Sequence, residues 1–159
     1  MAQLQLLRVD HGPALLAFER ENRAYFAASI PDRGDDYFAE FDVRHAALLA
    51  EQEVGTCYFH LVVGDGGAVL GRVNLLDLDG GSAELGYRIA ERAAGRGLAT
   101  ASVREVCVLA RETYGLTSLT ARATLDNPGS RAVLARAGFT PVGDIELNGR
   151  PGLRFVRDL

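Results

Sequence analysis

A strand–helix–strand passage in the middle of the chain constrains the fold most. Residues 82–89 (SAELGYRI) and 119–124 are short runs of strand type, and residues 98–114 between them repeat apolar side chains at the helical period. A helix that joins two neighbouring strands acts as a crossover, so the two strands are expected to run parallel. The chain is therefore predicted to build an α+β domain around a sheet.

The segment before this passage predicts an antiparallel meander. Residues 56–63 and 68–78 are rich in β-branched and apolar side chains, and the glycine-rich turn at 64–67 is typical of a hairpin. Gly80 and Gly81 provide a second tight turn into the strand at 82–89. Strands joined by such short turns pair in chain order.

Further helices and strands complete the order βααβββαβαββ. They are a strand at 3–9, helices at about 13–25, 36–53 and 128–137, and strands at 139–147 and 152–156. The helix at 128–137 is delimited most clearly, because Asn127 is a favourable N-cap, Pro128 fits the first helical position and Gly138 suits the end. No linker or repeat divides the sequence, so residues 1–159 are predicted to form a single domain.

Composition excludes several classes of protein. Hydrophobic residues make up 48% of the chain and charged residues 24%, as in ordinary globular domains, and the net charge of −4 disfavours nucleic-acid binding. The three histidines and two cysteines show no metal-ligand spacing, so no metal site is predicted. No apolar run reaches the length of a membrane span, and no signal peptide is recognised, which predicts a cytoplasmic protein without a membrane partner.

Residues 92–100 (RAAGRGLAT) carry the first chemical signal. Gly95 and Gly97 lie between a predicted strand and an amphipathic helix. Glycines let successive backbone N–H groups point the same way, and the start of the helix adds partial positive charge. This combination favours a phosphate or pyrophosphate pocket over an ordinary glycine-containing connection. The sequence is neither a P-loop nor a complete GxGxxG fingerprint.

Two motifs together resemble the acetyl-CoA-dependent N-acetyltransferase superfamily, known as GNAT. They are RxxGxG at 92–97, after the strand AELGYRI, and Asn-Pro-Gly-Ser at 127–130. The NxxS form of the second motif and the Asn-Arg-x-Tyr-Phe sequence at 22–26 are similar to the RimJ/RimL branch. The resemblance covers nearly the whole chain. It implies a mostly antiparallel sheet, splayed between the strands at 82–89 and 119–124 and flanked by about four helices.

The resemblance implies that acetyl-CoA is the co-substrate and lies in this splayed opening. Its pyrophosphate would bind backbone N–H groups of residues 96–100, its pantetheine arm would run along residues 87–89, and an N–H there would form an oxyanion hole. Asn127, besides capping a helix, would contact the pantetheine. The implied cofactor-binding residues are Tyr87, Arg88, Ile89, Arg92, Gly95, Arg96, Gly97, Leu98, Ala99, Thr100, Asn127 and Ser130.

Two residues are candidates for catalysis. Glu84 matches the strand position of the catalytic glutamate in several branches and is predicted to act as general base, directly or through water. Its alternative roles are a solvent-facing carboxylate or an ion-pair partner of an arginine, and strict strand alternation would place it on the opposite face from Tyr87. Leu134 stands where many branches have a tyrosine acid, so the resemblance assigns the departing thiolate to Ser130.

The acceptor is less constrained than the donor. The resemblance implies direct transfer in a ternary complex to a primary amine, and the branch implies the N-terminal amine of a ribosomal or other protein. Asn22, Arg23, Tyr25 and Phe26 would line the acceptor groove, although the two aromatic residues could equally be core and Arg23 solvated. A small-molecule amine acetyltransferase and a non-catalytic CoA-binding module remain as alternatives. Many relatives are dimers, so a homodimer is compatible with the sequence.

Overall fold

One seven-stranded sheet organises the computed structural model, which describes residues 2–159. The strand order is β1-β2-β3-β4-β5-β7-β6, and among these described strands only the β4–β5 pair is parallel. The strands are β1 (Gln3–Leu6), β2 (Tyr58–Val63), β3 (Val69–Asp79), β4 (Ser82–Ile89), β5 (Ser118–Thr124), β6 (Thr140–Leu147) and β7 (Arg150–Asp158). The predicted meander and the helical crossover into a parallel strand are confirmed.

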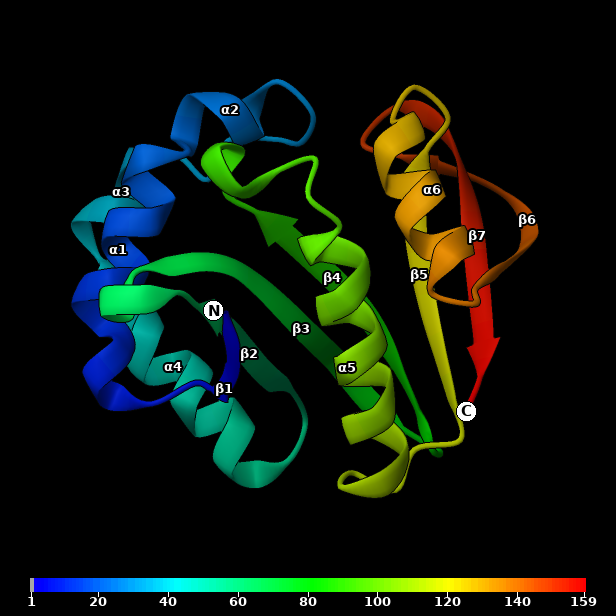
Figure 1. The fold of residues 1–159 in the computed structure, drawn as a ribbon, viewed down its shortest axis with the longest axis horizontal. Helices are drawn as coiled ribbons and strands as arrows, with labels where there is room; N and C mark the ends of the chain where they lie inside the picture. The colour runs from blue at the N-terminus through cyan, green and yellow to red at the C-terminus, as the bar shows by residue number, and fades with distance from the viewer. Residues whose placement is uncertain (1) are drawn as a thin grey trace.

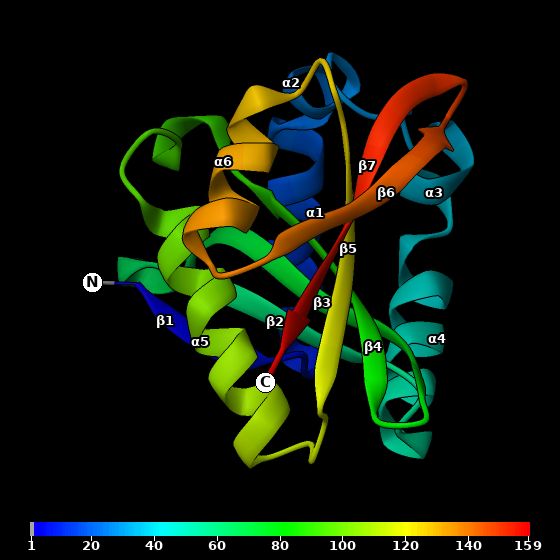
Figure 2. The ribbon, with the colours of Figure 1, turned by 90° about the vertical axis from the view of Figure 1, so that its right-hand side faces the viewer.

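Helices cover both faces of this sheet (Figures 1 and 2). The α-helices are α1 (Gly12–Glu21), α2 (Arg23–Ala27), α3 (Asp35–Ala39), α4 (Phe41–Val54), α5 (Leu98–Glu112) and α6 (Pro128–Arg136). α5 and α6 lie on one face, and the N-terminal helices lie on the other. Each face has its own apolar core, and neighbouring residues of β2 alternate between them: Leu61 packs on the N-terminal side and Val62 on the α5 side. None of the helices within residues 2–159 has the length and apolar character needed to cross a membrane.

Both long N-terminal helices of the prediction are broken in two. The first is interrupted at Asn22, whose Nδ2 donates to the Phe18 carbonyl (2.9 Å) and whose Oδ1 accepts from the Glu91 N–H (3.0 Å). The second is interrupted at Glu40, where φ is −105° and ψ is 21°. The apolar period continues across each break, which is why the sequence indicated one helix. Within residues 2–159, six α-helices therefore flank the sheet, where about four were predicted.

The predicted opening between β4 and β5 is confirmed. The two strands pair only where Ser82–Glu84 lies beside Ser118–Thr120, and the rest of β4 has no partner on that side. On its other edge β4 pairs with β3 in regular register from Glu84 to Ile89, while the irregularity lies in β3, between Leu76 and Asp79. Regular alternation therefore places Glu84 and Tyr87 on opposite faces of the sheet.

A buried ionic cluster fastens α1 to the sheet. The Glu19 side chain is 1% exposed and accepts hydrogen bonds from Arg72 on β3 (2.8 Å), Arg88 on β4 (3.0 Å) and Arg33 in the loop after α2 (3.0 Å). Burial by itself would raise the pKa of the Glu19 carboxyl, but the three guanidinium groups hold that pKa below its ordinary value. The carboxylate is thus charged in the folded protein at neutral pH.

We predict that Glu19→Gln lowers the free energy of unfolding at pH 7 by about 3–5 kcal/mol, because three guanidinium groups lose a buried counter-charge. The folded-state pKa is depressed, so this contribution is complete above the unfolded pKa of about 4.3 and is lost as pH falls through the folded value. Urea unfolding at several pH values measures the difference between wild type and variant, which should shrink in acid. Glu53→Gln, at an exposed position of α4, is the control and should change stability by no more than about 0.5 kcal/mol. A difference that does not vary with pH would contradict the charge argument.

Candidate active site

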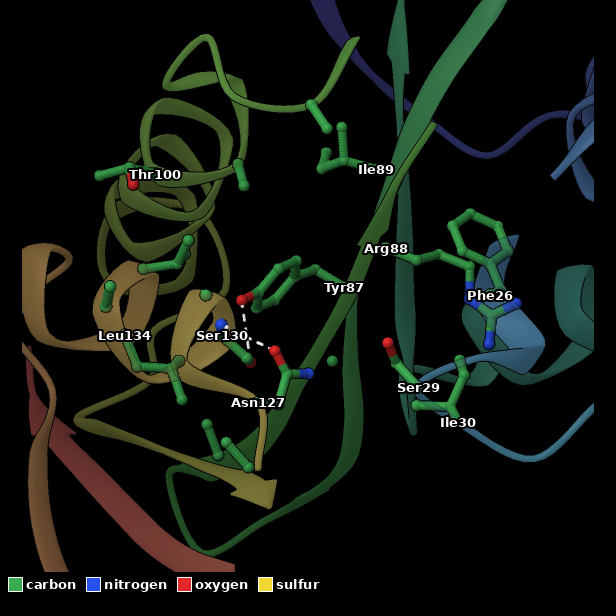
Figure 3. Close-up of a pocket in the computed structure, with 18 of the residues that line it drawn as sticks. Phe26, Ser29, Ile30, Tyr87, Arg88, Ile89, Thr100, Asn127, Ser130 and Leu134 are labelled. Carbon is green, nitrogen blue, oxygen red and sulfur yellow. Dashed lines mark hydrogen bonds between the residues drawn. The ribbon is translucent and has the colours of Figure 1, made fainter. Parts of the chain in front are cut away.

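The divergence of β4 and β5 opens a cavity of about 580 Å³, a size suited to a cofactor-sized ligand. β4 forms one wall, and β5 with the start of α6 forms the other. The glycine loop (residues 92–97) and the N-terminus of α5 lie on one side of β4, and α2 with the following loop lies on the other (Figure 3). Figure 3 shows the side chains that project into it from both sides of β4.

The glycine loop has the backbone conformation that an anion site requires. Gly95 and Gly97 have φ values of 75° and 76°, in the left-handed region that favours glycine, and Gly97 is the N-cap of α5. The Ala101 N–H donates to the Gly97 carbonyl (3.0 Å), so the N–H groups of residues 98–100 precede the first intrahelical bond. These donors and the positive end of α5 fit a pyrophosphate.

Most of the predicted cofactor-binding residues line this cavity, and two do not. Those that line it are Tyr87, Arg88, Ile89, Gly95, Gly97, Leu98, Ala99, Thr100, Asn127 and Ser130. Arg92 and Arg96 fall outside the lining, because Arg96 is exposed and the Arg92 Nε lies 3.7 Å from the carboxylate of Glu21. The backbone of β4 beyond Glu84 offers an unpaired strand edge, as an extended amide-bearing arm would need.

A hydroxyl pair joins the two walls of the cavity. The Tyr87 hydroxyl lies 3.0 Å from Ser130 Oγ, and the Ser130 N–H donates to Asn127 Oδ1 (3.2 Å), which confirms Asn127 as the N-cap of α6. Burial raises the pKa of Tyr87, so its hydroxyl is neutral at pH 7 and can donate a hydrogen bond. From the sequence, only the backbone of Tyr87 was predicted to contact the cofactor. Strand alternation could have identified its side chain, since Leu85 and Tyr87 share the face that α5 and α6 cover.

Glu84 lies outside the cavity lining. Its carboxylate forms an ion pair with Arg122 of β5 (2.5 Å), and Arg122 itself lines the cavity. The Glu84 side chain is 25% exposed, so water reaches it. The ion pair engages one oxygen of the carboxylate and leaves the other without a partner within residues 2–159.

Only two of the four predicted acceptor-groove residues face the cavity. Tyr25 and Phe26 line its α2 end. Asn22 is buried, with both side-chain polar atoms bound to backbone groups of the protein. Arg23 forms ion pairs with Asp32 and Asp35, each at 2.8 Å, and does not contribute to the lining.

The histidines have structural surroundings away from the cavity. His60 lies 3.0 Å from the Val73 carbonyl through Nδ1 and 2.6 Å from the Tyr114 hydroxyl through Nε2. Because a carbonyl only accepts, Nδ1 donates and Nε2 accepts, and burial lowers the pKa of His60. No cluster of potential metal ligands occurs in the part of the chain that the structure describes.

Comparison with known proteins agrees with this geometry. The family model described as the acetyltransferase (GNAT) domain matches residues 3–140, whereas a search of curated protein sequences finds no match. The chain is similar to the ribosomal-protein-S5-alanine acetyltransferase from Vibrio fischeri, with a TM-score of 0.92 and 18% identity over 99% of this chain and 92% of that one.

Two further solved structures share the fold. Mycobacterium smegmatis RimJ, in complex with CoA-disulfide, has a TM-score of 0.88 and 22% identity over 99% of this chain and 81% of that one. A spermidine N-acetyltransferase chimera from Vibrio cholerae and hSSAT has a TM-score of 0.81 and 17% identity over 98% of this chain and 93% of that one. Identities this low establish the fold alone. The family match over most of the sequence shows that the chain belongs to the GNAT family and is an acetyl-CoA-dependent N-acetyltransferase.

Proposed function

We propose that this enzyme transfers the acetyl group directly to the N-terminal α-amine of a protein or peptide. The observation that carries the proposal is the cavity, which runs from the α5 N-terminus past the free edge of β4 to α2, so that donor and acceptor can be bound together. The fold shared with a ribosomal-protein-alanine acetyltransferase favours a protein N-terminus as acceptor. A small-molecule amine is the second candidate, because a spermidine N-acetyltransferase chimera has the same fold.

Each step of the proposed reaction is assigned to particular residues of the cavity and its surroundings. The α5 N-terminus and glycine loop bind the pyrophosphate, and the edge of β4 binds the pantetheine and the acetyl oxygen. The amine nitrogen attacks the thioester carbon, the C–N bond forms, the C–S bond breaks, and the ammonium proton passes to Glu84 through water. Ser130, hydrogen-bonded to Tyr87, donates to the departing thiolate. A thiol with a pKa of about 8.5 leaves readily enough that this hydrogen bond suffices.

A panel of acceptors tests the proposed function. Release of free thiol from acetyl-CoA should be fast with peptides that begin with Ser, Ala or Thr, at rates within roughly 200-fold of one another. N-blocked versions that contain an internal lysine should be inert. The enzyme has no lysine, so its own side chains cannot act as acceptors in the assay. Spermidine or an aminoglycoside outperforming every peptide by orders of magnitude would favour the second candidate.

The role of Glu84 is tested with the nearly isosteric variant Glu84→Gln. As general base, the carboxylate should contribute about 10²–10⁴-fold to turnover, while the KM for acetyl-CoA stays unchanged. The pH–rate profile of the variant should lose its acidic limb. Arg122→Gln is the matched control, since it removes the ion-pair partner and keeps the base. A decrease of less than about threefold in Glu84→Gln would assign the carboxylate a structural role.

The variant Asn127→Asp distinguishes the N-cap role of Asn127 from its proposed contact with the cofactor. Aspartate is as good an N-cap as asparagine, so the melting temperature should hold. The exchange replaces the amide donors with a negative charge that faces the bound cofactor, so CoA affinity should decline. Thermal unfolding and titration calorimetry measure the two effects separately. Parallel losses of melting temperature and CoA affinity would mean that Asn127 acts only as the N-cap of α6.

A further inference from the structure

The charged side chains that line the cavity are all positive. Among the described residues in its wall they are Arg88, Arg122 and Arg136, and none is Asp or Glu. The chain as a whole has 21 acidic and 17 basic residues, so composition does not account for this bias. Arg136 lies beside α5, because Arg104 of that helix donates to its carbonyl (2.6 Å), and Arg122 is paired with Glu84. Arg88 is the charge that faces the acceptor end.

The Arg88 side chain projects from β4 on the side opposite Tyr87 (Figure 3). Its guanidinium lies over the Phe26 ring, 4.6 Å from the centroid, and the side chain is 17% exposed. Ser29 and Ile30 line the same end of the cavity. A flat guanidinium supported by an aromatic ring is held in a fixed orientation, so its donors are positioned for a ligand.

Arg88 has unused hydrogen-bonding capacity. Its Nη1 donates to Glu19 Oε1 (3.0 Å), while its Nε and Nη2 groups find no acceptor within residues 2–159. Glu19 is shared with Arg33 and Arg72, so one carboxylate faces three guanidinium groups. When the neighbouring ion pairs of Arg23 are included, four arginines face three carboxylates, and one positive charge stays uncompensated. The nearby Asp32 and Asp35 are both bound to Arg23.

An excess of positive charge in a half-buried place is costly unless an anion binds there. Burial and the neighbouring Arg33 and Arg72 lower the pKa of Arg88 to about 10, so it keeps its charge at pH 7. A carboxylate matches the free edge of a guanidinium with two parallel N–H donors. A polycation such as spermidine would meet repulsion in the same position.

We propose that Arg88 binds a carboxylate of the acceptor, so that the preferred substrate is an amine with a negative charge close to it. On the proposed function, on which this inference rests, that substrate is a polypeptide with Asp or Glu at its second or third residue. The α-carboxylate of a free amino acid offers the same chemistry from another source. Arg88 is then the residue that determines specificity at the acceptor end.

Matched peptide amides test the proposal. Ser-Asp-Ala and Ser-Ala-Asp are compared with Ser-Asn-Ala and Ser-Ala-Asn, and glycine is compared with glycinamide. In the wild type, kcat/KM should be about tenfold higher for the better aspartate peptide than for its asparagine partner, as expected for a charge-assisted hydrogen bond. Arg88→Gln should bring this ratio close to one.

Two control variants separate recognition from folding. Arg111→Gln alters an exposed arginine near the end of α5, about 20 Å along the helix from the glycine loop, and should keep the wild-type ratio. Arg88→Lys keeps the charge without the two-pronged donor and should retain part of the preference. Titration of the aspartate and asparagine peptides onto protein saturated with CoA gives the same comparison without turnover.

The outcomes distinguish this inference from the function on which it rests. Peptides acetylated without charge preference, equal affinities in the titration, or a ratio that survives in Arg88→Gln would each overturn the role of Arg88. The proposed function would then still stand. A preference for glycine over glycinamide that depends on Arg88, with all peptides inert, would support the carboxylate site and overturn the peptide acceptor.

Discussion

Backbone pairing between β4 and β5 ends after three residues on each strand, and the active site depends on that interruption. Backbone N–H and C=O groups in a protein interior need partners, so an unpaired strand edge is stable only where water or a ligand can reach it. α5 and α6 pack on the same face of the sheet and keep the two strands apart. The free edge is therefore fixed in place before any ligand arrives, which reduces the ordering required for binding.

Side chains alternate along β4, so neighbouring residues of this strand contact different groups on the two faces of the sheet. Tyr87 points to α6 and meets Ser130, on the side where the donor thioester would end. Its neighbour Arg88 points to α1 and α2 and meets Glu19 and Phe26. On the proposed function, a single strand would thus position groups for both substrates, while the buried Glu19 carboxylate ties α1 to that strand and to β3.

Much of this arrangement could be predicted from local signals. The glycine turns, the crossover helix and the Asn127 cap each depend on a few adjacent residues, and all were predicted. The break at Asn22 could not be, because it depends on a hydrogen bond to Glu91, far along the chain. The pairing of Glu84 with Arg122 depends on the register of two strands separated by a helix. The charge excess around Glu19 likewise required the tertiary structure, since its four members come from four separate segments.

The positive cavity also bears on how the acceptor becomes a nucleophile. An alkyl ammonium must lose a proton before it attacks, and a neighbouring like charge disfavours the protonated form. No acidic side chain among the described residues lines the cavity to stabilise an ammonium ion, and Arg88 stands at the acceptor end. On the inference above, the carboxylate of the acceptor would neutralise Arg88, so the paired arginine would no longer disfavour the ammonium form. Selection of the acceptor by Arg88 and removal of the ammonium proton by a base such as Glu84 would then be separate contributions, each with its own variant as a test.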